Sequence, residues 1–249
     1  AIGQQAGETS QGFANVAIGN VAGRTSQGNY GIAIGFYAGN ATQGTIATAI
    51  GAYAGQTNQS QYGIGLGYYA AAIDQCLNSI AIGTLAGYTN QGTKSVAIGY
   101  SAGSQDQSAN SVAIGNTAGA SNLGAYSTVI GNAAGGGDFP EYSIALNADA
   151  VQLTGDFSHA LYIKPIRNVD NSFLLQYNSS TNEVTYSRTL NIDKLDVRDI
   201  SVTNLDVSYR LLVEGDASFN KKVDISNQLE VLGDASFNNR VDIGNHLQV

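Results

Sequence analysis

Two short stretches of the sequence carry residue types that could do chemistry. Residues 99–103 (GYSAG) fit G-x-S-x-G, a pattern in which a sharp turn exposes a nucleophilic serine. Residues 65–70 (GLGYYA) fit the glycine pattern of a dinucleotide-binding turn. The serine would need a histidine base, and the sequence contains only His159 and His246. The glycine pattern would need a preceding strand and a following helix.

Both patterns coincide with a tandem repeat. Glycine recurs every 16 residues, preceded by Ile or Leu and followed three residues later by Ala, at positions 3, 19, 35, 51, 67, 83, 99, 115 and 131. Where one repeat has Ser101, others have Val21, Tyr37 or Thr117. The two motifs are therefore predicted to be by-products of the period, and the chain is predicted to be no enzyme and to use no cofactor and no metal.

The constant length of the repeat indicates stacked coils. No insertion breaks the period, although loops normally tolerate insertions. Sixteen residues suit two short strands and two turns, whereas a helical hairpin repeat needs about 33 residues. We therefore expect an all-β chain whose residues 1–150 form a parallel β-solenoid of ten 16-residue repeats. The last repeat, from Ile144, is degenerate.

Two polar columns follow from the same period. Asp and Asn alternate at Asn58, Asp74, Asn90, Asp106, Asn122 and Asp138, which suits turn residues better than a row of calcium ligands, because successive Asp would lie about 10 Å apart. An unbroken glutamine row could form a hydrogen-bonded ladder along the axis or simply supply polar turn residues; we expect the ladder, at Gln11, Gln27, Gln43, Gln59, Gln75, Gln91 and Gln107.

Small apolar residues occupy the middle of the first strand of every repeat. Val96 and Ile98 share one face of this strand and Ala97 takes the other. A strand that is apolar on both faces is buried on both. The surface against the alanines could be the opposite wall of the same coil or a neighbouring subunit. We expect the subunit to contact this column, which is Ala1, Ala17, Ala33, Ala49, Gly65, Ala81, Ala97, Ala113, Val129 and Ala145.

Aromatic residues gather in the two columns after the repeat glycine. They could bind glycan or pack between subunits, and we expect packing for this candidate adhesive or interface patch, which is Phe36, Tyr37, Tyr53, Tyr68, Tyr69 and Tyr100.

The sequence changes character after residue 150. Residues 151–189 are predicted to be a β connector, with a hairpin turn at 178–182 and an edge or bend at Pro165. Residues 190–207 carry apolar doublets every five residues, and an 18-residue repeat follows from Leu211. Two apolar residues per short strand make no private core, so residues 190–249 are predicted to form an intertwined trimeric stalk. The sequence does not tell whether ions lie on its axis.

Two resemblances accompany these patterns. Residues 95–102 (SVAIGYSA) resemble the head repeat of trimeric autotransporter adhesins, and the likeness covers about 1–150. It implies a left-handed parallel β-roll with three chains side by side. The remainder departs from that family, since it shows no neck, coiled-coil heptads or membrane anchor. Residues 162–168 (YIKPIRN), 181–187 (TNEVTYS) and 215–220 (GDASFN) resemble instead fibre proteins of large DNA viruses and phages.

Composition narrows the functional classes. The net charge of −8 comes with no basic patch, so nucleic acid is not an expected partner. No apolar run of about 18 residues predicts a membrane span, and one cysteine, Cys76, allows no intrachain disulfide. The chain begins and ends inside repeats, so we expect it to be an excerpt of a longer polypeptide.

We therefore expect a homotrimeric fibre outside the cell, on a virion or cell surface, that presents an adhesive or host-attachment surface to a glycan or protein receptor. The alternatives are a mechanical filament or matrix protein without a receptor and an ice-binding solenoid. The threonine row that ice binding needs is broken by Ala41 and Ile73. The viral or cellular origin and the receptor stay open.

Overall fold

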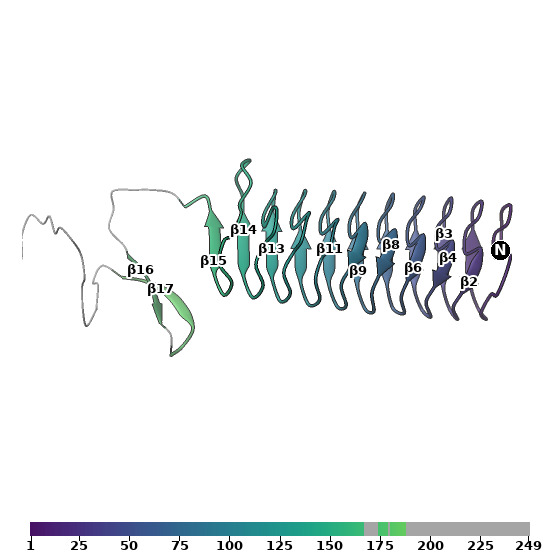
Figure 1. Cartoon of the computed structure of the whole chain (residues 1–249), viewed down its shortest axis with the longest axis horizontal. Helices are drawn as coiled ribbons and strands as arrows, with labels where there is room; N and C mark the ends of the chain where they lie inside the picture. The colour runs from purple at the N-terminus through teal and green to yellow at the C-terminus, as the bar shows by residue number, and fades with distance from the viewer. Residues whose placement is uncertain (167–173, 179, 188–249) are drawn as a thin grey trace, which may run out of the picture. The chain divides into compact units, whose positions relative to one another are not determined.

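The computed structural model describes residues 1–166, 174–178 and 180–187, which belong to two units, 1–172 and 173–249 (Figure 1). The described part contains strands and turns and no helix, and thus no helix that could cross a membrane. In the first unit the coils stack side by side along one axis (Figure 1).

Two parallel sheets form the walls of the solenoid. Sheet A has ten strands: β1 (Val16–Ile18), β3 (Ile32–Ile34), β5 (Thr48–Ile50), β7 (Ile64–Leu66), β9 (Ile80–Ile82), β11 (Val96–Ile98), β12 (Val112–Ile114), β13 (Thr128–Gly131), β14 (Ile144–Asn147) and β15 (Leu161–Lys164). Sheet B has five: β2 (Thr25–Gln27), β4 (Ala41–Gln43), β6 (Thr57–Gln59), β8 (Ile73–Gln75) and β10 (Thr89–Gln91).

The register confirms the predicted period. Ala17 pairs with Ala33, and Ala33 with Ala49, each 16 residues further along the chain. Backbone hydrogen bonds continue between coils through the turns, as from Gly83 N to Leu66 O at 2.8 Å. The parallel β-solenoid with 16-residue coils is therefore confirmed, with strands that are mostly three residues long. The left-handed sense of the coil stays a prediction.

The solenoid extends beyond residue 150, where the sequence pattern placed its end. Strand β15 pairs in parallel with β14, with Ala145 opposite Tyr162, so this last coil is one residue longer than the others. Strand β15 ends directly before Pro165 and forms the edge of sheet A. Proline has no N–H to donate to a ladder, which explains why the strand stops there.

The second unit contains the predicted hairpin. Strands β16 (Leu174–Asn178) and β17 (Glu183–Ser187) pair antiparallel, with Leu175 opposite Tyr186 and Tyr177 opposite Val184. The Asn178 side chain accepts a hydrogen bond from Ser180 N at 2.9 Å, as in an Asx turn. The predicted stalk at 190–249, with its doublets and 18-residue repeat, lies outside the described residues.

The repeat glycine is required by both conformation and contact. Gly83 has a φ of 125°, a region that residues with a side chain rarely adopt. A Cβ at this position would lie 2.5 Å from the carbonyl oxygen of Gly99 on the next coil. Coils can therefore approach closely at this corner only when the column is glycine.

We predict that Gly83→Ala destabilises the fold by about 2–5 kcal/mol, from backbone strain plus the clash with Gly99, and lowers Tm by roughly 5–15 °C. Gly137 is the matched control, because its φ is also positive, at 76°, and a Cβ there would meet nothing within 4 Å. Thermal unfolding followed by circular dichroism measures both. Equal losses in the two variants would show that the contact between coils does not matter.

Candidate interaction surfaces

The alanine column lies inside its own coil. Ala33, Ala49 and Ala97 are fully buried within the single chain. A Cβ added to Gly103 would come within 3.2 Å of the Cβ of Ala97, so the turn backbone of the same coil covers this alanine. The interpretation of the column as a contact with a neighbouring subunit is therefore wrong. The opposite wall already closes against it, and no room remains for a second chain.

The glutamine row also lies inside. Its members from Gln27 to Gln107 are at most 1% exposed, whereas Gln11 in the first coil is exposed. Amide-to-amide hydrogen bonds join Gln43 to Gln59 at 3.0 Å, Gln75 to Gln91 at 3.0 Å and Gln91 to Gln107 at 3.4 Å. Between these segments the ladder is interrupted, because the amide oxygens of Gln27, Gln43 and Gln75 have no partner within the described coils.

Each glutamine amide also ties the two walls of a coil together. Gln91 Nε2 donates to the carbonyl oxygen of Ile80 at 2.7 Å, and the other buried members make the same contact with sheet A. After Gln107 the column continues as Leu123 and Phe139, both buried. The interior therefore changes from a polar seam to an apolar one along the axis.

The outer side of sheet A carries the large aliphatic residues. Because the alanines point inward, their neighbours along each strand point outward and are only partly buried or exposed. Two rows, none of whose members is charged, make up this outer face of sheet A: Val16, Ile32, Thr48, Ile64, Ile80, Val96, Val112, Thr128, Ile144 and Leu161 in one, and Ile18, Ile34, Ile50, Leu66, Ile82, Ile98, Ile114, Ile130, Leu146 and Ile163 in the other.

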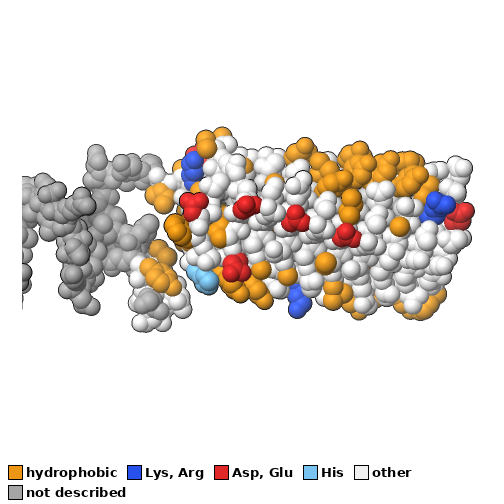
Figure 2. All heavy atoms as spheres, viewed as in Figure 1, with side chains coloured by type: hydrophobic (Ala, Val, Ile, Leu, Met, Phe, Trp, Pro, Cys, Tyr) orange, Lys and Arg blue, Asp and Glu red, His pale blue; other side chains and the backbone are white. Residues whose placement is uncertain are grey.

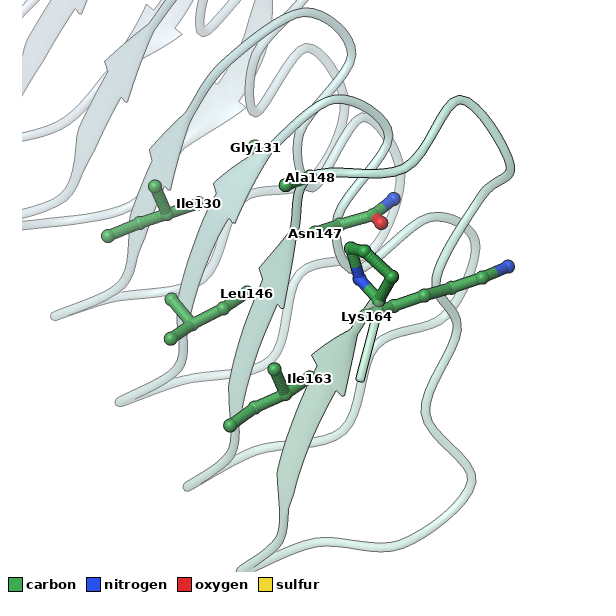
Figure 3. Close-up of a pocket in the computed structure, with 8 residues that line it drawn as sticks. Ile130, Gly131, Leu146, Asn147, Ala148, Ile163 and Lys164 are labelled. Carbon is green, nitrogen blue, oxygen red and sulfur yellow. The ribbon is translucent and has the colours of Figure 1, made fainter. Parts of the chain in front are cut away.

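A shallow groove lies at the C-terminal end of this face. Figure 3 shows the side chains of Ile130, Leu146 and Ile163, from three successive strands, projecting to the same side. Together with Lys164 and Pro165 they line a space of about 390 Å³. The groove is apolar and holds no convergent polar groups, so it belongs to the outer face of sheet A rather than to a separate ligand site.

The aromatic patch forms one cluster at a turn, apart from Tyr100. The rings of Tyr37 and Tyr53 stack at 5.6 Å, and those of Tyr53 and Tyr69 at 4.5 Å and 3°. Phe36 and Tyr68 stand edge-on against this stack, each with a ring centroid 4.6 Å from its neighbour in sequence. Burial and the neighbouring tyrosines raise the pKa of Tyr69.

Sequence reasoning missed a second group of aromatic residues at the opposite turn. Phe13 and Tyr30 meet edge-on at 4.8 Å, and Tyr126, Tyr142 and His159 stack in series at 5.1 and 4.9 Å. Figure 2 shows hydrophobic side chains gathered along both long edges of the solenoid, most densely over the N-terminal coils. The signal was available, since Tyr30, Tyr62, Tyr126 and Tyr142 share one column of the 16-residue repeat.

The alternating Asn and Asp side chains of the acidic column form hydrogen bonds with one another between coils. Asn58 donates to Asp74 at 2.8 Å, Asn90 to Asp106 at 2.7 Å, and Asn122 to Asp138. Asp74 lies inside strand β8 rather than in a turn, as Asn58 and Asn90 do in β6 and β10, so the expectation of turn residues is wrong for these three. No group of three potential metal ligands occurs in the part of the chain that the structure describes.

The motif serine lies in the same repeated geometry. Ser101 has a φ of 50°, and Tyr37 and Thr117 have φ values of 57° and 52° at the equivalent position. His159 stacks on Tyr142 in a later coil, and His246 lies outside the described residues.

Comparison with protein-family models, with curated proteins and with solved structures gives no match for this chain.

We predict that Ala97→Leu disrupts the coil itself, because the added carbons have no space between the two walls; overpacking costs about 1–3 kcal/mol or more. Ala109→Leu is the control, since its column already holds Phe13 and Leu77 in other coils. Circular dichroism of dilute samples should show a lower Tm for Ala97→Leu alone. If Ala97→Leu changed the mass of the assembly and left its Tm unchanged, the alanines would contact a neighbouring subunit after all.

Proposed function

We propose that this chain is a segment of a homotrimeric fibre that stands outside the cell, on a cell surface or virion, and presents an attachment surface. The observation that carries the proposal is the outer face of sheet A. Two rows of Ile, Val, Leu and Thr run the length of ten strands without a charge. Exposed apolar faces of this kind mark contact surfaces in soluble proteins.

The face suits further copies of the same chain. Its strands repeat every 4.8 Å or so, which makes a straight strip about 45 Å long. A straight strip with the same residues at every level fits another straight strip of the same kind. Three copies around one axis bury all three strips in a closed, thin structure, and cyclic closure leaves no strip free for uncontrolled association.

The geometry of the repeat supports the fibre role. A solenoid gains length with each coil, and its turns carry the variable side chains on the outside. The resemblances to trimeric adhesin heads and to viral fibres support attachment as the purpose of that length. The described coils carry few charged side chains, which favours a neutral receptor, such as a glycan, over nucleic acid.

We predict that Ile98→Lys prevents assembly. Three ammonium groups would meet near the axis, and each desolvated ion costs several kcal/mol, so association should weaken at least about 100-fold. Thr89→Lys, at a partly exposed position of sheet B, is the matched control and should assemble normally. Analytical ultracentrifugation at equal concentrations compares the two. Normal assembly of Ile98→Lys would mean that this face is not the contact.

Attachment is tested separately from assembly. The fluorescently labelled oligomer should bind to a subset of cells or arrayed glycans, and the Ile98→Lys variant should lose most of this avidity because single sites act alone. An oligomer that binds no cell and no glycan would instead be a mechanical filament.

A further inference from the structure

The outer face of sheet A is bordered by two columns of exposed side chains. The leading edge lies two residues before each strand and consists of Tyr30, Ile46, Tyr62, Asn78, Lys94 and Asn110. The trailing edge lies two residues after each strand and consists of Phe36, Ala52, Tyr68, Thr84, Tyr100 and Asn116. Most members of both edges are exposed in the single chain.

The two edges match in chemical kind, coil by coil. Tyr30, 51% exposed, shares its coil with Phe36, 44% exposed. Two coils further on, Tyr62 and Tyr68 are 45% and 51% exposed. The coil between these two has aliphatic residues at both edges.

The match continues where the residues become polar. Lys94 lies on the same coil as Tyr100, and an ammonium group over a tyrosine ring is a favourable cation–π pair. The following coil has an asparagine at each edge, Asn110 and Asn116, and amides can hydrogen-bond to one another.

A single chain offers no reason for this agreement. The two edges of a coil are six residues of nearly extended backbone apart, roughly 20 Å, so their side chains do not touch. Cyclic symmetry about an axis parallel to the solenoid keeps every coil at the same height in each copy. The trailing edge of one copy then meets the leading edge of the next at the same coil.

We infer that the two edges are the two halves of one heterologous contact between copies of this chain. This contact rests on the proposed assembly through the outer face of sheet A and deepens it. The strip between the edges covers about 450 Å², given its length and the span of a three-residue strand. A standard interface buries about 800 Å² per partner, so the edges supply area that the strip lacks.

The arrangement of the rings favours a protein partner over a sugar. Parallel stacking of Tyr37, Tyr53 and Tyr69 already covers ring faces that a sugar would use. Phe36 and Tyr68 stand on this stack and project from it, as anchors of an interface do.

The edge contact ends where the match ends. In the same two columns beyond the edges, Ala14 shares its coil with Asn20. Tyr126 and Tyr142 share their coils with Asn132 and Ala148, and these two tyrosines stack on each other and on His159 instead. The contact between copies therefore covers residues 30–116.

Cross-linking with a short bismaleimide tests the inference in a Cys76→Ser background, since Cys76 is free and exposed. The first pair is Tyr62→Cys with Tyr68→Cys. A second pair, Asn110→Cys with Asn116→Cys, removes no aromatic packing and serves if the first folds poorly. The mismatched control is Tyr62→Cys with Asn116→Cys, whose coils differ in height by about 14 Å.

Both matched pairs should give a covalent trimer as the main product on a denaturing gel, and the single variants and the mismatched control should stay monomeric. Ultracentrifugation of each variant before reaction separates the possible failures. A monomer overturns the proposed assembly and the edge contact together. An intact oligomer without the covalent trimer overturns the edge contact alone and leaves its rings free for another ligand. Cross-linking of single variants means that like edges meet, which also overturns it.

Discussion

The narrow interior of each coil constrains the rest of this structure. Two short strands face each other so closely that alanine fills the inward position of sheet A, with one row of longer side chains between the walls. Most large aliphatic residues of the sheet A strands therefore lie on the outer side of the sheet. A solenoid built in this way buries little apolar area within one chain. It holds together by backbone hydrogen bonds between coils and leaves its apolar face partly exposed in the single chain.

The row of longer side chains shows how the interior adapts. Glutamine spans the gap and bonds to the backbone of sheet A, as Gln91 does to Ile80. Toward the C-terminal end the row becomes Leu123 and then Phe139, and Tyr162 replaces the strand alanine. Phe139, between β13 and β14, meets Tyr162 of β15 edge-on with ring centroids 5.7 Å apart, and the coil between β14 and β15 is one residue longer than the others.

Sequence periodicity was enough to predict the parallel solenoid, its 16-residue register and the later hairpin, because each follows from spacing alone. It could not decide which side of the strand faces inward. Alternation separates Ala97 from Val96 and Ile98, and the usual rule that larger apolar residues are inside fails when the coil is too narrow. Strand β15 was missed for a related reason, since its 17-residue offset and Tyr162 both depart from the repeat. The leading edge was not predicted because its tyrosines stand singly in the sequence, whereas Phe36 and Tyr68 each precede another tyrosine.

The central claim is that the outer face of sheet A is covered by two further copies of the chain. Sedimentation equilibrium of the unaltered chain tests it most directly. We predict one species with three times the 25.8 kDa mass of a single chain, unchanged on dilution through the micromolar range. A particle of 25.8 kDa at every concentration would contradict the account.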